Sequence, residues 1–330
     1  MSPSNLPDAI LAAAERLKPH VRQTPLEHSL AFSQLTGMEV WLKLENLQHT
    51  GSFKARGAMN KLLSLSPGQL AAGVVTASSG NHGAGVAWGL GRLGSRGLVF
   101  APENAAEAKL DYIRRYGVEV RKHGVSGDDT ELFARAYAVQ NGMVYISPYN
   151  DLEVVAGQGT VGVEIAGQLV MAQEAGVPSQ QPPLNVFVTV GGGGLISGVA
   201  AFLKSVSPRV RVIGCQPEND AVMMASVGAG RIVQIDALTT LSDGSAGGLE
   251  PGAITFDLCR SLVDEWVTVS EQEIREAMRR FIGSEFMLLE GAAGVALAAL
   301  TKAAGRYPAQ QAVAVICGGK ISLDGLKSIL

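Results

Sequence analysis

Short runs rich in valine, isoleucine and leucine alternate with helical patterns along almost the whole chain. Several runs are apolar without interruption, as in parallel strands covered on both faces. This alternation predicts an α/β fold, with open, twisted, mostly parallel sheets and helices on both faces. We expect strands at 40–44, 74–77, 97–101, 118–121, 143–146, 185–190, 210–214 and 312–317. Helices are expected at 7–18, 82–93, 105–116, 128–141, 153–174, 195–205, 271–283 and 290–304.

Two punctuation signals refine this pattern. Ser270 and Glu273 form a capping box, which predicts a helix start. The segment 178–183 holds three prolines and two glutamines, and we interpret it as a surface connection.

Charge and composition exclude several classes of protein. The 330 residues carry 27 Lys plus Arg against 30 Asp plus Glu, a net charge of −3 without a basic block, so we expect no nucleic-acid partner. Three cysteines are too few for a disulfide framework. The first residues lack the pattern of a signal peptide, and no uninterrupted apolar run approaches the roughly 20 residues of a membrane span. We therefore expect a cytoplasmic protein without a membrane partner.

Glycines concentrate in loops that follow strands, where ligands bind in α/β folds. Gly191, Gly192, Gly193 and Gly194 follow one strand and open the helix at Leu195. Uncovered N–H groups at a helix N-terminus favour a phosphate, and a plain tight turn would need only one or two glycines. Two G-x-G-x-x-G patterns, 89–94 and 157–162, lie inside expected helices and do not indicate a dinucleotide.

Two further loops carry chemistry. Ser78, Ser79, Gly80, Asn81 and His82 follow a strand and suit a carboxylate or a ring hydroxyl, although helix capping by Ser79 or Asn81 is an equal alternative. On sequence grounds His82 is more often structural than catalytic.

The third loop, 51–58, holds Lys54 in an apolar, glycine-flanked setting. A desolvated lysine attacks carbonyl groups, whereas a lone lysine is usually solvated or ion-paired. Together the three loops indicate pyridoxal 5′-phosphate as the cofactor, because they combine a phosphate cradle, a Schiff-base lysine and a polar loop for an amino acid.

The chain resembles the fold-type-II pyridoxal-phosphate enzymes, which share the fold of the tryptophan synthase β chain. The similarity is greatest to the serine/threonine dehydratase (ammonia-lyase) and serine racemase group. It runs nearly from end to end, through segments 22–26, 43–48, 51–58, 78–83, 156–160, 191–195, 243–244 and 317–319.

The resemblance implies roles residue by residue. Lys54 would hold the cofactor as a Schiff base and later take the Cα proton, and Ser79 would lie on the opposite face of the substrate. Cofactor contacts would come from Phe53, Asn81, Gly191, Gly192, Gly193, Gly194, Leu195, Gly244, Glu290 and Cys317. Substrate contacts would come from Ser78, Ser79, Gly80, His82, Ser147, Tyr149 and Asn150.

The implied reaction is elimination of water from a 3-hydroxy amino acid, followed by loss of ammonia, to give a 2-oxo acid. Alternatives are an amino-acid racemase, a β-replacement synthase and a carrier that binds the cofactor without turnover. The segment 147–150 stands where relatives often have His-Pro. The substrate is thus serine, threonine or a bulkier or more polar compound such as 3-phenylserine, 3-hydroxyaspartate or a hydroxyectoine derivative.

The sequence also departs from the family pattern at a cation site and at Lys320. Metal-using relatives have glutamate where Gln216 stands and aspartate where Val222 stands, so we expect no tight metal site. Lys320 is expected to be a surface lysine.

A large cofactor-binding domain would comprise 1–66 and 149–330, and 67–148 would form a small mobile domain. By analogy with the family, we expect a homodimer or homotetramer that acts on a small amino-acid substrate.

Overall fold

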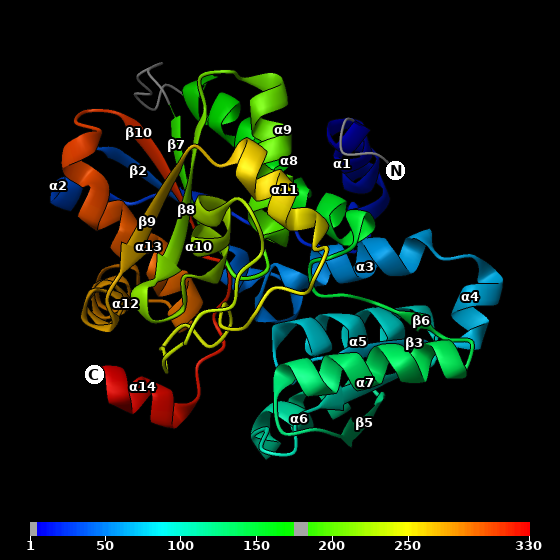
Figure 1. The fold of residues 1–330 in the computed structure, drawn as a ribbon. Helices are drawn as coiled ribbons and strands as arrows, with labels where there is room; N and C mark the ends of the chain where they lie inside the picture. The colour runs from blue at the N-terminus through cyan, green and yellow to red at the C-terminus, as the bar shows by residue number, and fades with distance from the viewer. Residues whose placement is uncertain (1–4, 175–183) are drawn as a thin grey trace.

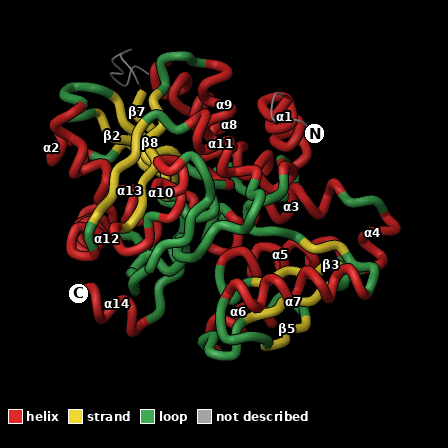
Figure 2. The backbone as a smooth tube through the Cα atoms, viewed as in Figure 1, coloured by secondary structure: helices red, strands yellow, loops and turns green. Residues whose placement is uncertain are grey.

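The computed structural model describes residues 5–174 and 184–330, and they form two sheets with helices on both faces (Figures 1 and 2). The larger sheet has the order β1-β2-β10-β7-β8-β9 and the smaller one β5-β4-β3-β6. All neighbouring strands are parallel except β1 and β2. The expected α/β fold is confirmed.

The larger sheet holds residues from both ends of the chain. Helix α13 (Gly291–Ala303) packs on the sheet beside α12 (Glu271–Glu285), and α9 (Gly194–Val206) packs on it beside α8 (Leu152–Glu174). Its strands are β1 (Leu26–His28), β2 (Glu39–Lys43), β7 (Leu184–Thr189), β8 (Arg211–Pro217), β9 (Glu265–Val269) and β10 (Gln311–Val315). The other helices of this part are α1 (Leu6–Leu17), α2 (Leu30–Thr36), α10 (Val222–Ala229), α11 (Ile254–Leu262) and α14 (Leu323–Ile329).

The smaller sheet alternates its apolar side chains between two cores. Val74 and Val99 belong to a core with α5 (Asn81–Leu93) and α6 (Glu107–Arg114), whereas Val75 and Phe100 belong to one with α7 (Gly127–Gln140). This is the period-two pattern of a sheet covered on both faces. Its strands are β3 (Val74–Ala77), β4 (Gly97–Ala101), β5 (Glu119–Lys122) and β6 (Val144–Tyr145), and α4 (Pro67–Ala72) precedes β3.

Glycines allow three helices to cross almost backbone to backbone. Helix α3 (Lys54–Ser64) meets α8 at Gly57, where a Cβ on Gly157 would lie 2.7 Å from the Gly57 Cα. On the far side α8 meets α9, where a Cβ on Gly198 would lie 2.7 Å from the Gly159 Cα. The G-x-G-x-x-G pattern at 157–162, inside α8, is therefore a packing feature.

Helix α8 is, by length and composition, apolar enough over Leu152–Ala172 to cross a membrane, but 61% of that window is buried. Its contacts with α1, α3 and α9 identify it as a core helix. The sequence predicts this helix at 153–174 but not as a possible membrane span, because glutamates and glycines interrupt its apolar residues.

All eight expected strands and eight expected helices are present. Strands β3 and β4 have the expected bounds, the other elements differ at one or both ends, and Ser270 and Glu273 form the expected capping box. The edge strands β1 and β9 were not predicted from the sequence, nor were helices α2, α3, α4, α10, α11 and α14. The segment 51–58 is not wholly a loop, because α3 begins at Lys54; Gly57 resembles a helix breaker but is required by the crossing with α8. The expected surface connection 178–183 lies outside the described residues.

Candidate active site

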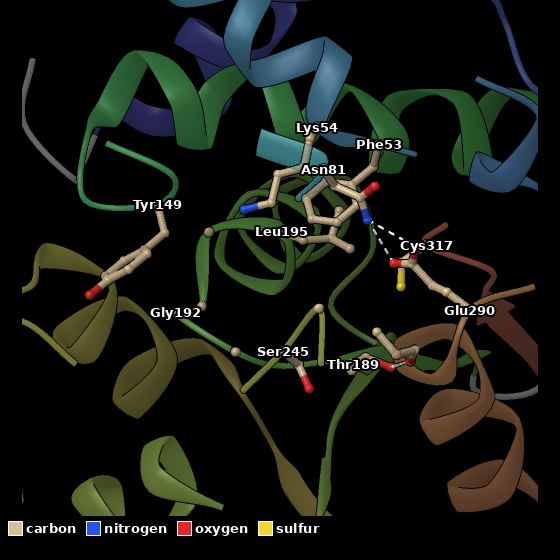
Figure 3. Close-up of a pocket in the computed structure, with 15 residues that line it drawn as sticks. Phe53, Lys54, Asn81, Tyr149, Thr189, Gly192, Leu195, Ser245, Glu290 and Cys317 are labelled. Carbon is tan, nitrogen blue, oxygen red and sulfur yellow. Dashed lines mark hydrogen bonds between the residues drawn. The ribbon is translucent and has the colours of Figure 1, made fainter. Parts of the chain in front are cut away.

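One pocket lies where the carboxyl end of β7, the start of α3 and the loop before α13 meet (Figure 3). Its lining comprises Phe53, Lys54, Asn81, Tyr149, Thr189, Gly191, Gly192, Gly193, Gly194, Leu195, Gly244, Ser245, Glu290, Ala292 and Cys317. All three chemistry-bearing segments singled out in the sequence thus contribute to a single cavity.

Backbone contacts place Lys54. The Phe53 N–H donates to the Cys317 carbonyl at 3.1 Å, and the Gly319 N–H donates to the Gly51 carbonyl at 2.9 Å. Helix α5 approaches so closely that a Cβ on Gly85 would lie 3.1 Å from the Lys54 carbonyl carbon. The lysine is therefore held between two segments that are far apart in the sequence.

The Lys54 amine is poorly solvated. Burial lowers the pKa of Lys54 to about 8, although the nearby Cys317, Glu290 and Glu131 act in the opposite direction. Its Nζ donates to the Pro148 carbonyl at 3.0 Å and lies 5.3 Å from the centre of the Phe53 ring. A lysine with a lowered pKa is a better nucleophile and proton acceptor at neutral pH than an ordinary one.

The tetraglycine segment forms a cradle that side chains would fill. A Cβ on Gly191 would lie 2.8 Å from the Ser245 carbonyl oxygen, and one on Gly192 would lie 2.2 Å from the Tyr149 ring. Gly193 has φ +81°, which favours glycine, and it precedes α9 without a side-chain cap. The first N–H groups of a helix lack intrahelical partners, so this end of α9 suits an anion such as a phosphate.

A half-buried amide bonded to a buried carboxyl closes the opposite side of the pocket. Asn81 Nδ2 donates to both oxygens of Glu290, at 2.8 and 2.9 Å (Figure 3). Burial raises the pKa of Glu290 to about 7, against the effect of the Asn81 hydrogen bond. Burial also raises the pKa of the neighbouring Cys317 thiol well above its usual value, so Cys317 is neutral.

The segment 147–150 forms the wall nearest the Lys54 amine. Tyr149 lines the pocket, and its hydroxyl accepts a hydrogen bond from the Glu250 N–H at 3.0 Å. Ser147 is buried and its Oγ accepts from the Asn150 N–H at 3.0 Å, while Asn150 Oδ1 accepts from the Ile254 N–H at 2.9 Å. Ser147 and Asn150 therefore hold Tyr149 in place but do not line the pocket.

The loop before α5 stands at the pocket's edge. Ser78, Ser79 and Gly80 are half-buried, and Ser78 Oγ accepts from the Gly80 N–H at 3.1 Å. His82 is buried behind them, where its Nε2 lies 3.1 Å from the Ile146 carbonyl oxygen and burial lowers its pKa to about 3. These four residues do not line the pocket, and their expected contacts with a substrate stay predictions.

Three lining residues were missed in the sequence: Thr189, Ser245 and Ala292. Thr189 ends β7 directly before the tetraglycine segment, and Ser245 follows Gly244, so adjacency to a recognised motif could have indicated both. Lys320 is not the expected surface lysine: it is half-buried, its Nζ lies 4.1 Å from the centre of the Tyr112 ring, and burial lowers its pKa to about 8.

Gln216 has a structural part. Its Nε2 donates to the Val190 carbonyl at 3.1 Å and its Oε1 accepts from the Met224 N–H at 2.8 Å. Of the two acidic residues beside it, Glu218 pairs with Lys302, and Asp220 accepts from the Gly247 N–H. These contacts occupy the side chains that a cation would need, and the expectation of no tight metal site stays a prediction.

Comparison with known proteins decides the family. A sequence model of the family described as "Pyridoxal-phosphate dependent enzyme" matches residues 17–318. The chain belongs to this family. Its enzymes use pyridoxal 5′-phosphate, so the cofactor expected from the three loops is confirmed, as is the resemblance to fold-type-II enzymes.

Relatives cover almost the whole chain. The catabolic L-threonine dehydratase TdcB of Escherichia coli K12 is 39% identical over 98% of this chain and 95% of its own. A processed threonine deaminase of Solanum lycopersicum has a TM-score of 0.91 and 32% identity, over 99% of this chain and 87% of its own. Maize serine racemase has a TM-score of 0.88 and 29% identity, over 98% and 95%.

Proposed function

We propose that the protein is a dehydratase (ammonia-lyase) that removes water and then ammonia from a serine- or threonine-like 3-hydroxy amino acid and yields a 2-oxo acid. Support comes from the threonine dehydratase of Escherichia coli and the threonine deaminase of tomato, which match nearly end to end. The observation that carries the proposal is the arrangement of the pocket: a Lys54 amine of lowered pKa faces one wall, a glycine cradle lies below it and a neutral Cys317 thiol lies opposite.

The pocket fits the cofactor of the family. The cradle at 191–194 has room for a phosphate only because Cβ atoms are absent, and the N-terminus of α9 supplies N–H donors. The Asn81 amide, which donates to Glu290, and the Phe53 ring, whose centre is 5.3 Å from the Lys54 amine, also line the pocket. When bound, pyridoxal 5′-phosphate supplies an electron sink that acidifies the Cα of an attached amino acid.

The residues of this chain then divide the work. Lys54 would hold the cofactor and would also take the Cα proton of the substrate, because its lowered pKa leaves a share of the amine neutral at physiological pH. Cys317 stays a neutral thiol, because burial raises its pKa well above the usual value. Beside the bound cofactor it would supply no negative charge, unlike a carboxylate, and this would favour loss of a β-leaving group. Ser78, Ser79 and Gly80 bind the substrate carboxylate at the pocket's edge, with His82 behind them.

Tyr149 shapes the end where the substrate side chain lies. Burial raises the pKa of Tyr149, so its phenol remains protonated. Ser147 and Asn150 keep the ring against the tetraglycine segment through the hydrogen bonds that end in α11.

Closure accompanies binding in this proposal. Residues 67–148 form the small mobile domain and 1–66 with 149–330 the large one. The smaller sheet spans 74–145, and an ion pair between Lys109 and Asp243, at 2.5 Å, joins the two parts across the site. Closing the site would exclude water from the reacting atoms. We also propose a cytoplasmic homodimer or homotetramer.

A racemase is the second candidate. Maize serine racemase is among the structural neighbours. Ser79 would act on the opposite face from Lys54; it is half-buried, and its hydroxyl makes no hydrogen bond among the described residues. A β-replacement synthase remains a further alternative, as do bulkier or more polar substrates.

The deciding experiment incubates the holoenzyme with L-serine, L-threonine and 3-phenylserine and follows 2-oxo acid, ammonia and the chirality of the recovered amino acid. Equal amounts of 2-oxo acid and ammonia support the dehydratase. Inverted amino acid without 2-oxo acid would establish the racemase, and turnover that requires an added thiol would establish the synthase.

A further inference from the structure

Lys54 directs its amine toward Tyr149, away from the side of Asn81, Glu290 and Cys317 (Figure 3). The amine also donates to the Pro148 carbonyl, next to Tyr149 in the chain. The wall at 147–150 is therefore the part of the pocket nearest the group that would act on the substrate's Cα. Groups behind this wall are placed to discriminate between substrate side chains.

Three charged side chains lie behind the wall, and we name them the charge cluster: Glu131 and Arg135 from α7, and Glu250 from the loop before α11. Arg135 Nη2 lies 2.7 Å from Glu131 Oε1 and 2.6 Å from Glu250 Oε2. Both carboxylates are about one-fifth exposed, and Arg135 is about one-third exposed. Water screens such a cluster less than a surface pair.

The cluster is bonded to the wall itself. Ser147 Oγ donates to Glu250 Oε1 at 3.5 Å, and the Glu250 N–H donates to the Tyr149 hydroxyl at 3.0 Å. The guanidinium of Arg135 lies 4.3 Å from the centre of the Tyr145 ring, on the strand that leads into the wall. A change of charge in the cluster is therefore transmitted to the residues that border the substrate.

The cluster carries an excess of negative charge, because two carboxylates face one guanidinium. Its charges reach the pocket. Burial is the main cause that raises the pKa of Tyr149; the charges of Glu250 and Glu131 act in the same direction, against the Glu250 N–H bond and the charge of Arg135. Glu131 also acts to raise the pKa of Lys54, which burial lowers. A third carboxylate entering this end would meet repulsion from the two in place and an Arg135 already neutralised by them. A neutral or cationic side chain would meet no such penalty.

We infer that Glu131, Arg135 and Glu250 act as a charge filter that rejects amino acids with an acidic side chain and admits neutral or cationic ones. The inference rests on the proposed function for its site and names the substrate class. Among the substrates considered from the sequence, it retains serine, threonine, 3-phenylserine and a cationic hydroxyectoine derivative, and it excludes 3-hydroxyaspartate.

Binding of an isosteric pair tests the filter without relying on elimination. L-Asparagine and L-aspartate differ in charge but hardly in shape. We titrate each into the holoenzyme and follow the change in cofactor absorbance. The wild type is expected to bind L-aspartate at least about tenfold more weakly than L-asparagine. Equal binding, or tighter binding of L-aspartate, would overturn the inference, because the Arg135 guanidinium would then be compensating the charge of the ligand's carboxylate.

Variants give the effect a sign. Glu250→Gln and Glu131→Gln keep the shape of the side chain and should each shift the binding ratio toward L-aspartate by about three- to tenfold, whereas Arg135→Gln should shift it further toward L-asparagine. Opposite signs within one cluster are not expected from simple loss of packing. Glu119→Gln, which removes a carboxylate paired with Arg121 on β5, is the matched control and should leave the ratio unchanged. The same direction of change for all three variants would overturn the filter.

The two proposals fail separately. If serine and threonine yield no 2-oxo acid but the asparagine preference and its response to Glu250→Gln hold, the dehydratase is wrong and the filter stands. If serine and threonine are dehydrated while 3-hydroxyaspartate is dehydrated equally well, the filter is wrong and the dehydratase stands.

Discussion

The two ends of the pocket are built from different materials. At the cofactor end, the tetraglycine segment, the start of α9 and the carbonyl and amide groups around Cys317 are mostly backbone. At the end beside Tyr149, the wall is held by side chains from α7, from 147–150 and from the loop before α11. A binding site formed by backbone groups keeps its shape when single residues are substituted. A site formed by side chains can change its ligand preference through one substitution. The difference explains how one family keeps a cofactor while its substrates diverge.

The largest expected effect is the loss of turnover when the lysine at the cofactor end is removed. Lys54→Ala should reduce turnover of serine or threonine by about 10³-fold or more, because it removes both the amine that binds the cofactor and the proposed base. Turnover and the cofactor absorbance are measured together. Lys327→Ala, which changes a lysine 79% exposed on α14, is the control and should retain normal turnover. Undiminished elimination by Lys54→Ala would refute the assignment.

The next test adds one methyl group to the backbone cradle. Gly191→Ala places a Cβ 2.8 Å from the Ser245 carbonyl oxygen, a backbone atom that cannot rotate away. We expect the cofactor affinity to fall about tenfold or more, while the protein remains folded. Equilibrium dialysis with pyridoxal 5′-phosphate measures it. Gly228→Ala, where a Cβ would meet nothing within 4 Å, should bind the cofactor as the wild type does; equal loss in both variants would contradict the cradle.

Glu290, a buried carboxyl that lines the cofactor end, gives a pH signature. Burial raises the pKa of Glu290 from 4.5 to about 7. Between these values the folded chain keeps a proton that the unfolded chain has released, so the free energy of unfolding falls as the pH rises. The full shift corresponds to about 3 kcal/mol. Urea unfolding of the cofactor-free protein at pH 5 and pH 8 should show this loss, and Glu290→Gln should remove it; an unchanged pH dependence in the variant would contradict the assignment.

The smallest expected effect is that of metal removal on turnover, because we assign a metal ion to neither end of the pocket. Because the side chains of Gln216 and Asp220 already bond to backbone groups, chelation should change turnover by less than about twofold. Turnover is compared before and after EDTA, with Mg²⁺ added back. A large loss that Mg²⁺ reverses would show that a cation acts at this loop after all.

The same contrast explains what the sequence could predict. The tetraglycine segment, Lys54 and Asn81 stand in short local patterns, so the fold and cofactor could be inferred, and the structure brings these residues into one pocket with Gly244, Glu290 and Cys317. Their individual roles remain predictions.

Contacts between distant segments left no local pattern. Asn81 bonds to Glu290, 209 residues away, and the hydrogen bond from Glu250 to Tyr149 spans 101 residues. Gly57 was misleading because the sequence showed the glycine but not the helix that crosses it. Charge pairing across the wall therefore could not be anticipated from composition or spacing.

The close crossings of α3, α8 and α9 have a consequence for anyone who would redesign this enzyme. At Gly57, Gly157 and Gly198 a Cβ would lie within 2.8 Å of backbone atoms, so substitution at these positions would push the helices apart. The loop before α11 and the exposed parts of α7 have no such helix crossings; in the loop, Gly247 and Gly252 have positive φ and should be kept. A mutant library confined to those two surfaces would allow selection for new substrates without moving Lys54.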